Sequence, residues 1–459
     1  MTTTSTMTSA TFTFPDPDVT TYCDGEHLAV RVRQTGPSPM NPLNLAFLID
    51  VSHSMGENHR LNRVKQTLYA IRTRNLWSPT DRVTLVTFSK VATTCCDHLV
   101  MDAVGIDTLY HLLDALEPDS ATDLGAGLER LQLVQRPTDP FDAILLLTDG
   151  NVTSGLLRTN TSLCAVATAV GSLRGETTPT PFHVLGYGAD HNRKLSRDLA
   201  VQSRGTYTYV DNAEILPVAM GDILSGARAE VFRGATVAAG EGWLCDSDVA
   251  PYALGGIIPD RDYWVLFKRS TLSLSTHPVS VHITLVCVTA TGSRTLCHTT
   301  SASVSAPEES LILLEQVFHS RLTHALVTAS NCIETTGTWN RALLEELLEN
   351  LSALPREQQS RPKLLAVREQ AEDMLRFLLP PTTNHTHPPQ HHHGIAAARL
   401  HIAARMSSAA AIYSTQRGVQ MGSEILVSGD PAPISSFASP MQRGVSTQMY
   451  DEYKSMNPT

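Results

Sequence analysis

The stretch Leu45-Ala46-Phe47-Leu48-Ile49-Asp50-Val51-Ser52-His53-Ser54-Met55 decides the fold of this chain. Its first five residues are a continuous apolar run, which is typical of a strand buried on both faces of a parallel sheet. The run stops at Asp50, Ser52 and Ser54, so a carboxylate and two hydroxyls reach the carboxyl end of the strand. Ligands of open α/β sheets bind beyond that edge, and Mg²⁺ prefers hard oxygen ligands. The stretch therefore predicts an α/β sheet with a Mg²⁺ site at its edge.

Strand and helix patterns alternate from residue 43 to residue 227, as expected for a doubly wound, mostly parallel sheet. After the first strand, apolar residues between Leu61 and Ile71 recur at helical spacing and predict one buried helix face. Residues 82–89 and 143–148 are further predicted strands, because each is a short run rich in β-branched or apolar residues.

The pattern Asp-x-Ser-x-Ser at residues 50–54 resembles the metal-ion-dependent adhesion site of von Willebrand factor type A domains. Ser120-Ala121-Thr122-Asp123-Leu124 resembles the threonine loop of that family, and Leu147-Thr148-Asp149-Gly150 resembles the aspartate that follows its fourth strand. The resemblance implies a Rossmann-like fold for residues 43–227. It also implies that residues 92–101 form a short antiparallel edge strand.

The same resemblance implies a role for each residue of the metal site. Ser52 and Ser54 would bind Mg²⁺ directly, and Thr122 would bind it directly or through water. Asp50 and Asp149 would act mainly through water and hydrogen bonds. Mn²⁺ or Ca²⁺ could replace Mg²⁺. The alternative is that these residues only cap helices and form turns, as Ser, Thr and Asp often do.

The loops around this site are the predicted partner-binding surface. They contribute His53, Met55, Asp123 and Gly150. A bound Mg²⁺ would keep an exchangeable water, which an Asp or Glu of a partner protein could replace. We expect no catalytic residues here, because Ser52 stands where phosphoryl-transfer sites of the Asp-x-Asp type carry their second acid.

The rest of the chain predicts a second and a third unit. Alternating, β-branched runs over residues 228–304 predict an antiparallel sandwich, to which residues 11–42 contribute strands, so the α/β domain is inserted in or next to it. Leucine stripes over residues 305–379 predict packed helices. The remaining expected segments are a disordered N-terminus (1–10), a His- and Pro-rich linker (380–393), a helix (394–417) and an irregular tail (418–459).

A second resemblance concerns the layout of residues 228–450. It is similar to the VWA/Hedgehog-intein-like domain that accompanies type A domains in certain eukaryotic proteins. Relatives can carry a RING finger or an autoprocessing domain. This chain has no Cys/His pattern for a zinc-binding RING finger and no room for the autoprocessing domain. Neither ubiquitin ligation nor self-splicing is therefore expected.

Composition limits the classes of partner. The net charge of −10 argues against a nucleic-acid interface, which would be basic and clustered.

No apolar run approaches the length of a membrane span, and residues 1–10 lack the charged start and apolar core of a secretory signal. The 8 cysteines form no C-x-x-C pattern. These features favour an intracellular, cytoplasmic location.

Three functions remain to be compared. The leading hypothesis is a protein-binding module that depends on a divalent cation. The second is a structural scaffold in a multiprotein assembly, in which the metal only stabilises the loops. The third is a metal-dependent hydrolase, against which the absence of a Gly-x-Ser-x-Gly elbow, a P-loop and a dinucleotide fingerprint argues.

Overall fold

The structure is a computed structural model. It describes residues 17–377 except 38–39, 137, 150–151, 158, 173–179, 189–190, 211–214, 246–251, 271–278, 290–291, 303–305 and 337–339, together with residues 445, 448, 449, 451 and 455. The predicted segments 1–10, 380–393 and 394–417 lie outside the described residues.

The first unit is built on a six-stranded sheet with the strand order β5-β4-β3-β6-β7-β8. All neighbouring strands are parallel except β4 and β5, which are antiparallel, as expected from the family resemblance. The strands are β3 (Asn44–Asp50), β4 (Arg82–Phe88), β5 (Ala92–Val100), β6 (Ala143–Thr148), β7 (Phe182–Tyr187) and β8 (Tyr207–Val210).

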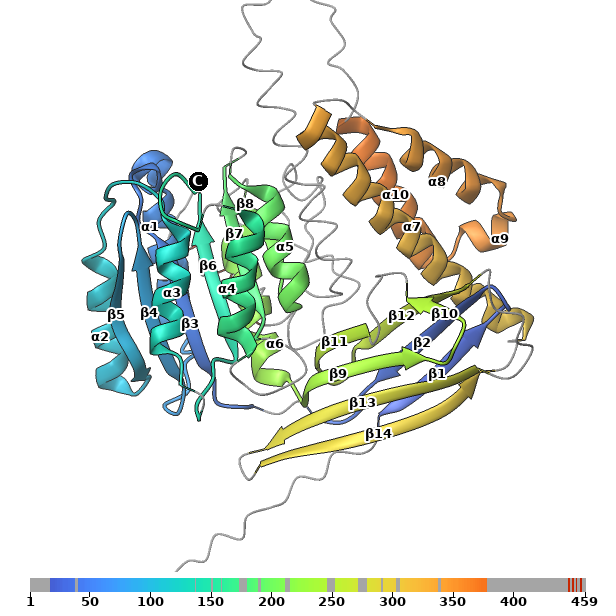
Figure 1. Ribbon diagram of the computed structural model, residues 1–459, viewed down its shortest axis with the longest axis horizontal. Helices are drawn as coiled ribbons and strands as arrows, with labels where there is room; N and C mark the ends of the chain where they lie inside the picture. Colours follow the sequence, from blue (N-terminus) through green and yellow to red (C-terminus); the bar gives the residue numbers. More distant parts are fainter. Residues whose placement is uncertain are drawn as a thin grey trace, which may run out of the picture.

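Helices cover both faces of this sheet (Figure 1). Strand β3 is buried along its whole length, because Leu45, Phe47 and Ile49 pack into one core and Ala46 and Leu48 into another. Helices α1 (Arg60–Thr73), α2 (Ala103–Asp114) and α6 (Ile215–Ala229) pack against the first core, and α3 (Leu124–Val134), α4 (Asn160–Ser172) and α5 (Arg193–Ser203) against the second. The predicted doubly wound fold is confirmed.

The second unit is a sandwich of two four-stranded sheets, with the orders β1-β2-β12-β10 and β11-β9-β13-β14. Strand β2 pairs with β12 so that Val30 lies opposite Val265, and residues before the α/β domain therefore supply strands to the sandwich. This confirms the predicted insertion. The strands are β1 (Asp18–Cys23), β2 (His27–Arg33), β9 (Phe232–Ala239), β10 (Trp243–Cys245), β11 (Tyr252–Ile257), β12 (Asp262–Arg269), β13 (Val279–Thr289) and β14 (Gly292–Ala302).

The chain enters and leaves the α/β domain at the same place, and Arg228 joins the two crossings. The backbone N–H of Asn41 donates to the carbonyl of Arg228 at 3.1 Å, and the guanidinium of Arg228 donates to the carbonyl of Asn41 at 3.1 Å. The same guanidinium forms a two-point ion pair with Asp81, at 3.0 and 2.6 Å. Both side chains are buried, so this pair holds the end of α6 against the loop that precedes β4.

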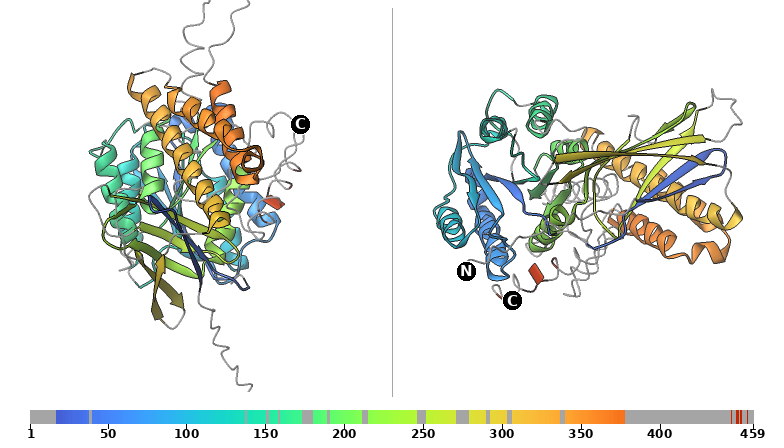
Figure 2. Two further views of the ribbon diagram at one scale, coloured as in Figure 1. Left: turned by 90° about the vertical axis from the view of Figure 1, so that its right-hand side faces the viewer. Right: turned by 90° about the horizontal axis from the view of Figure 1, so that it is seen from below.

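The third unit is helical and packs on the sandwich, as the views in Figures 1 and 2 show. Leu313 of the first helix is buried against Tyr22, Ala29 and Trp264, which lie on the outer face of the sheet β1-β2-β12-β10. The helices are α7 (Pro307–Thr336), α8 (Ala342–Ala353), α9 (Arg356–Gln359) and α10 (Pro362–Phe377).

The predicted irregular tail requires a correction at the positions that the structure describes. Residues 445, 448, 449, 451 and 455 are helical. Met449 is fully buried in the core that α1, α2 and α6 share, and Val445 packs against that core. These residues are therefore held by the apolar core of the first unit, which is far from the tail in the sequence. Among the helices of the described residues, none is long and apolar enough to cross a bilayer.

Candidate functional site

The candidate site lies where the order of the sheet reverses. The chain runs from β3 outward to β4 on one side, and later returns to β6 on the other side of β3. Crevices at such switch points, beyond the carboxyl ends of the strands, are the usual ligand sites of doubly wound folds. Asp50 ends β3 and Asp149 directly follows β6, so the two carboxylates flank the switch point.

Asp50 is fully buried, and its two oxygens accept hydrogen bonds from different elements. Oδ1 accepts from the backbone N–H of Ser52 at 2.8 Å, and Oδ2 accepts from the hydroxyl of Thr148 at 2.6 Å. Burial raises the pKa of Asp50 to about 6, while the hydrogen bonds from Ser52 and Thr148 oppose the shift and the charge of Asp149 adds to it. A cation beside Asp50 and Asp149 would stabilise both ionised carboxylates.

The serines lie in the turn that connects β3 to α1. Ser52 is 1% exposed and Ser54 is half-buried, and their hydroxyl oxygens are 3.2 Å apart. The short 3₁₀ segment η1 (His53–His59) follows Ser52, and the backbone N–H of Met55 donates to the carbonyl of Ser52 at 2.9 Å. The turn therefore holds the two hydroxyls side by side.

Met55 corrects one of the partner contacts expected from the sequence. Its side chain is fully buried in the core beneath the turn, where it packs with residues of β3 and α1. The apolar side chain anchors the loop rather than facing a partner. Because that anchor holds the turn from below, Met55 supports the position of Ser52 and Ser54.

Asp149 completes a chain of polar contacts across the switch point. Its Oδ1 accepts from the hydroxyl of Ser54 at 2.8 Å, and its Oδ2 accepts from the guanidinium of Arg60. The carboxylate of Asp149 is inaccessible to solvent, whereas the side chain of Arg60 is 15% exposed. Ser52, Ser54 and Asp149 are thus brought together directly, and Thr148 links Asp50 to the strand that carries Asp149.

Thr122 reaches the same edge from the loop between α2 and α3. Hydrogen bonds tie this loop to the metal-site turn: the N–H of His53 donates to the carbonyl of Ser120 at 3.0 Å. The N–H of Thr122 donates to the hydroxyl of Thr153 at 3.0 Å, in the loop that follows β6. Thr122 is 4% exposed, and it lines a small pocket together with Thr148. All the residues of the predicted metal site therefore lie along one sheet edge.

The remaining predicted contact residues differ in their surroundings. His53 is exposed beside the serines, as a partner-facing residue must be. Asp123 is half-buried and caps α3, because its Oδ1 accepts from the N–H of Ala126 at 3.0 Å. Gly155, at φ +94°, packs against the Asp123 carboxylate so closely that a Cβ there would lie 2.2 Å from its oxygens. Gly150 lies outside the described residues.

Two substitutions of Asp123 can show whether its hydrogen bond or its negative charge stabilises α3. Asp123→Ala should lower the free energy of unfolding by about 1 kcal/mol, because the N–H of Ala126 loses its acceptor. Asp123→Asn should leave stability almost unchanged, because asparagine is an equally good cap. Urea unfolding followed by circular dichroism measures both values. Equal losses in the two variants would contradict the capping role.

The donor chemistry of this edge fits a small, hard divalent ion. The available groups are hydroxyl and carboxylate oxygens, which Mg²⁺ prefers, and the hydroxyls add no charge to the site. Within the described residues, no group of three or more His, Cys, Asp or Glu side chains is positioned to hold a metal. An ion at this edge would therefore depend on the hydroxyls of Ser52, Ser54 and Thr122.

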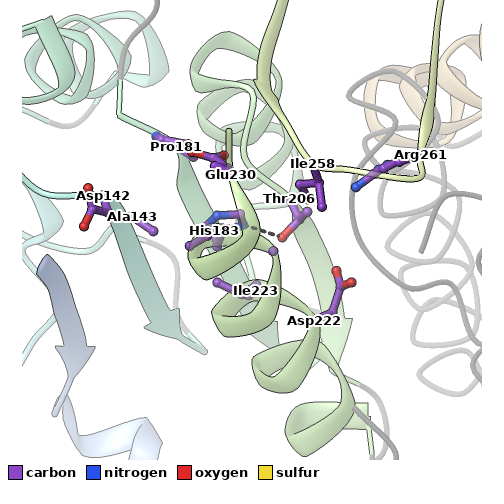
Figure 3. A pocket seen from close by; sticks show the side chains of 12 residues that line it. Asp142, Ala143, Pro181, His183, Thr206, Asp222, Ile223, Glu230, Ile258 and Arg261 are labelled. Carbon is purple, nitrogen blue, oxygen red and sulfur yellow. Dashed lines mark hydrogen bonds between the residues drawn. The ribbon is translucent and has the colours of Figure 1, made fainter. Parts of the chain in front are cut away.

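A second, small cavity lies at the opposite end of the strands (Figure 3). Asp142 and His183 line it from the α/β sheet, Asp222 from α6, and Arg261 from the turn before β12. The imidazole of His183 hydrogen bonds to the hydroxyl of Thr206 at 2.9 Å. This cavity belongs to the junction between the α/β domain and the sandwich, and it is separate from the switch-point edge.

Sequence reasoning missed two residues of the site, Thr148 and Arg60. Thr148 directly precedes Asp149 in the sequence motif, and its hydroxyl donates a hydrogen bond to Asp50. Arg60 is the first residue of α1, and that helix has no acidic residue in its first turn. A cation at the positive end of a helix dipole is unfavourable and calls for a carboxylate partner, which was the available signal.

Comparison with known proteins agrees with this geometry. Residues 45–151 match the family model described as von Willebrand factor type A domain. A von Willebrand factor type A protein from Catenulispora acidiphila superimposes with a TM-score of 0.58 at 14% identity, covering 82% of this chain and 93% of that chain. The ArnB paralog VWA2 from Sulfolobus acidocaldarius superimposes with a TM-score of 0.52 at 15% identity, covering 86% of this chain and 98% of that chain. At these identities the structures show a shared fold.

Sequence relatives cover a smaller region. Inter-alpha-trypsin inhibitor heavy chain H3 from Rattus norvegicus is 26% identical over 176 residues, which are 36% of this chain and 19% of that protein. The Homo sapiens protein of the same name is 24% identical over the same length. The chain thus matches less than a fifth of the length of these relatives. Residues 45–151 thus resemble a von Willebrand factor type A domain in sequence, the chain shares the fold of such proteins, and the candidate site lies at the edge of the α/β sheet.

Proposed function

We propose that this chain is a protein-binding module in which a divalent cation, Mg²⁺ in the first place, captures an acidic side chain of a partner protein. Type A domains commonly mediate protein–protein interaction or adhesion. The observation that carries the proposal is the row of oxygens from Ser52, Ser54 and Asp149, joined by hydrogen bonds at the switch point of the sheet. In this proposal Ser52, Ser54 and Thr122 hold the ion, and Asp50 and Asp149 orient its water ligands.

The arrangement of charge favours capture of a carboxylate over catalysis. An ion held mainly by neutral hydroxyls keeps much of its positive charge, which a partner carboxylate can neutralise. The hydrolase alternative needs a general acid or base beside the ion. Position 52, which would supply it in an Asp-x-Asp site, is a serine. We therefore propose a binding role without catalysis.

A capture experiment tests this function against the scaffold alternative. The full chain is immobilised and incubated with extract from its native source, in parallel with Mg²⁺ and with EDTA. A Ser52→Ala chain serves as the site variant, and a Ser352→Ala chain serves as the control, since the hydroxyl of Ser352 contacts only its own helix at 2.7 Å. We expect a partner that is retained with Mg²⁺ and lost with EDTA or with Ser52→Ala. Retention that EDTA leaves unchanged would favour the scaffold function.

A further inference from the structure

Arg60 places a permanent positive charge inside the candidate metal site. One nitrogen of its guanidinium donates to Asp149 Oδ2 and lies 3.4 Å from the carbonyl oxygen of Ser54. The other oxygen of Asp149 accepts from the hydroxyl of Ser54 at 2.8 Å. Arg60 therefore contacts the carboxylate that borders the predicted ion, as well as the backbone of one of its predicted ligands.

The local backbone is shaped to bring Arg60 to this position. Asn58 and His59 both have positive φ, at +50° and +57°, which few residues other than glycine adopt. This bend ends η1 and starts α1 at Arg60, at the positive end of the helix dipole. That end disfavours a cation, and the ion pair with buried Asp149 offsets the cost.

We propose that Arg60 is an internal counter-cation that competes with the divalent ion for Asp149 and thereby sets the metal affinity of the site. The inference rests on the proposed function, because it assumes that the ion binds at this edge. With Asp50 and Asp149 ionised, Arg60 reduces the charge of the site from −2 to about −1, which weakens its attraction for a divalent ion. When no ion is bound, Arg60 supplies a positive charge that compensates the buried carboxylate of Asp149.

The test compares Arg60→Gln with Arg60→Lys, which keeps the charge. Arg63→Gln is the matched control, since it removes the same charge from the same helix one turn further on. Two readouts are used on the full chain: Mn²⁺ affinity, from the loss of the free-ion signal in electron paramagnetic resonance, and Tm with and without Mg²⁺. We expect Arg60→Gln to bind Mn²⁺ at least about tenfold more tightly than the wild type. Arg60→Lys and Arg63→Gln should both stay close to the wild type.

Thermal stability gives the second readout. Without divalent ions, Arg60→Gln should have a lower Tm than the wild type, because the buried carboxylate of Asp149 loses its ion pair with Arg60. Saturating Mg²⁺ should restore most of this loss and should shift the wild type much less. An Arg60→Gln chain that folds only when Mg²⁺ is present would also support the proposal.

Four results would overturn it. Unchanged affinity in Arg60→Gln would mean that its charge does not reach the ion, and weaker affinity would mean that Arg60 only positions Asp149. Equal tightening in Arg60→Gln and Arg60→Lys would mean that charge is not the cause. If neither the wild type nor any Arg60 variant binds Mn²⁺, the proposed metal site itself fails. Wild-type binding that Arg60→Gln leaves unchanged would instead remove the role of Arg60 alone.

Discussion

Replacing Arg228 with methionine is expected to lower the free energy of unfolding by about 3–5 kcal/mol, because it breaks a buried ion pair and leaves one charge behind. The carboxylate of Asp81 is inaccessible to solvent and is paired with Arg228 through both oxygens, at 3.0 and 2.6 Å. Methionine fills a similar volume but leaves this charge unpaired. The backbone N–H groups of Leu43 and Ser78 still donate to Asp81, so the loop before β4 keeps part of its support.

Arg376→Met provides the matched control for this prediction. Arg376 pairs with Asp373 at 3.0 Å on α10, but its side chain is 67% exposed. Exposed pairs of this kind contribute at most about 1 kcal/mol. Urea unfolding of both variants, monitored by tryptophan fluorescence, measures the difference. Similar losses of unfolding free energy in the two variants would show that the buried Arg228–Asp81 pair does not stabilise the junction where the chain enters and leaves the α/β domain.

The second large effect concerns the metal site. A chain carrying both Ser52→Ala and Ser54→Ala should lose Mg²⁺ affinity by more than about 100-fold. Removing a group that only hydrogen bonds to a metal ligand already lowers metal affinity roughly 10–100-fold. Here two proposed direct ligands are removed. The fold should persist, since Asp50 keeps its hydrogen bonds from the backbone N–H of Ser52 and the hydroxyl of Thr148, and Asp149 keeps its contact with Arg60.

Isothermal titration with Mg²⁺ measures this loss, and Ser352→Ala again serves as the control. Circular dichroism should show wild-type secondary structure in the double variant. Metal binding by the double variant with wild-type affinity would place the ion elsewhere in the chain and would contradict the assignment of Ser52 and Ser54.

The α/β domain could be predicted from the sequence because short apolar runs and the polar residues after them indicate its strands. The apolar run before Asp50 allows only a strand buried on both faces, and the structure places Leu45 and Ala46 in opposite cores. Polar residues at the ends of such strands must meet at one edge, since parallel strands share their direction. The position of Asp50 therefore followed from the pattern, and that of Asp149 from the resemblance to type A domains.

Other features depend on contacts between residues far apart in the sequence, which no local pattern encodes. Arg228 and Asp81 are separated by 147 residues, and neither stands in a recognisable motif. Arg60 is one of many charged residues at helix ends, and only the fold reveals that it contacts Asp149. Burial of Met55 and Met449 was missed for the same reason, because an apolar residue in a predicted loop or tail gives no sign of the core that receives it.

The insertion of the α/β domain into the sandwich was predictable, because one predicted strand is not followed by a second strand with which it could pair. The alternating pattern of residues 27–33 is a strand without a neighbouring partner strand after it, because residues 36–42 break the pattern and the α/β domain follows. On one side it pairs with β1, and its partner on the other side is β12, more than 200 residues later. The exact register between β2 and β12 required the structure.

The most direct test of the central claim is a crystal structure of the full chain grown with Mn²⁺, with an anomalous difference map recorded at the manganese absorption edge. We expect one strong peak at the switch point, in contact with the hydroxyl oxygens of Ser52, Ser54 and Thr122. We also expect Asp50 and Asp149 to lie within hydrogen-bonding reach of the ion's water ligands. A fully occupied peak elsewhere, with Arg60 still paired to Asp149 and no density at the switch point, would show that the ion does not bind at this edge.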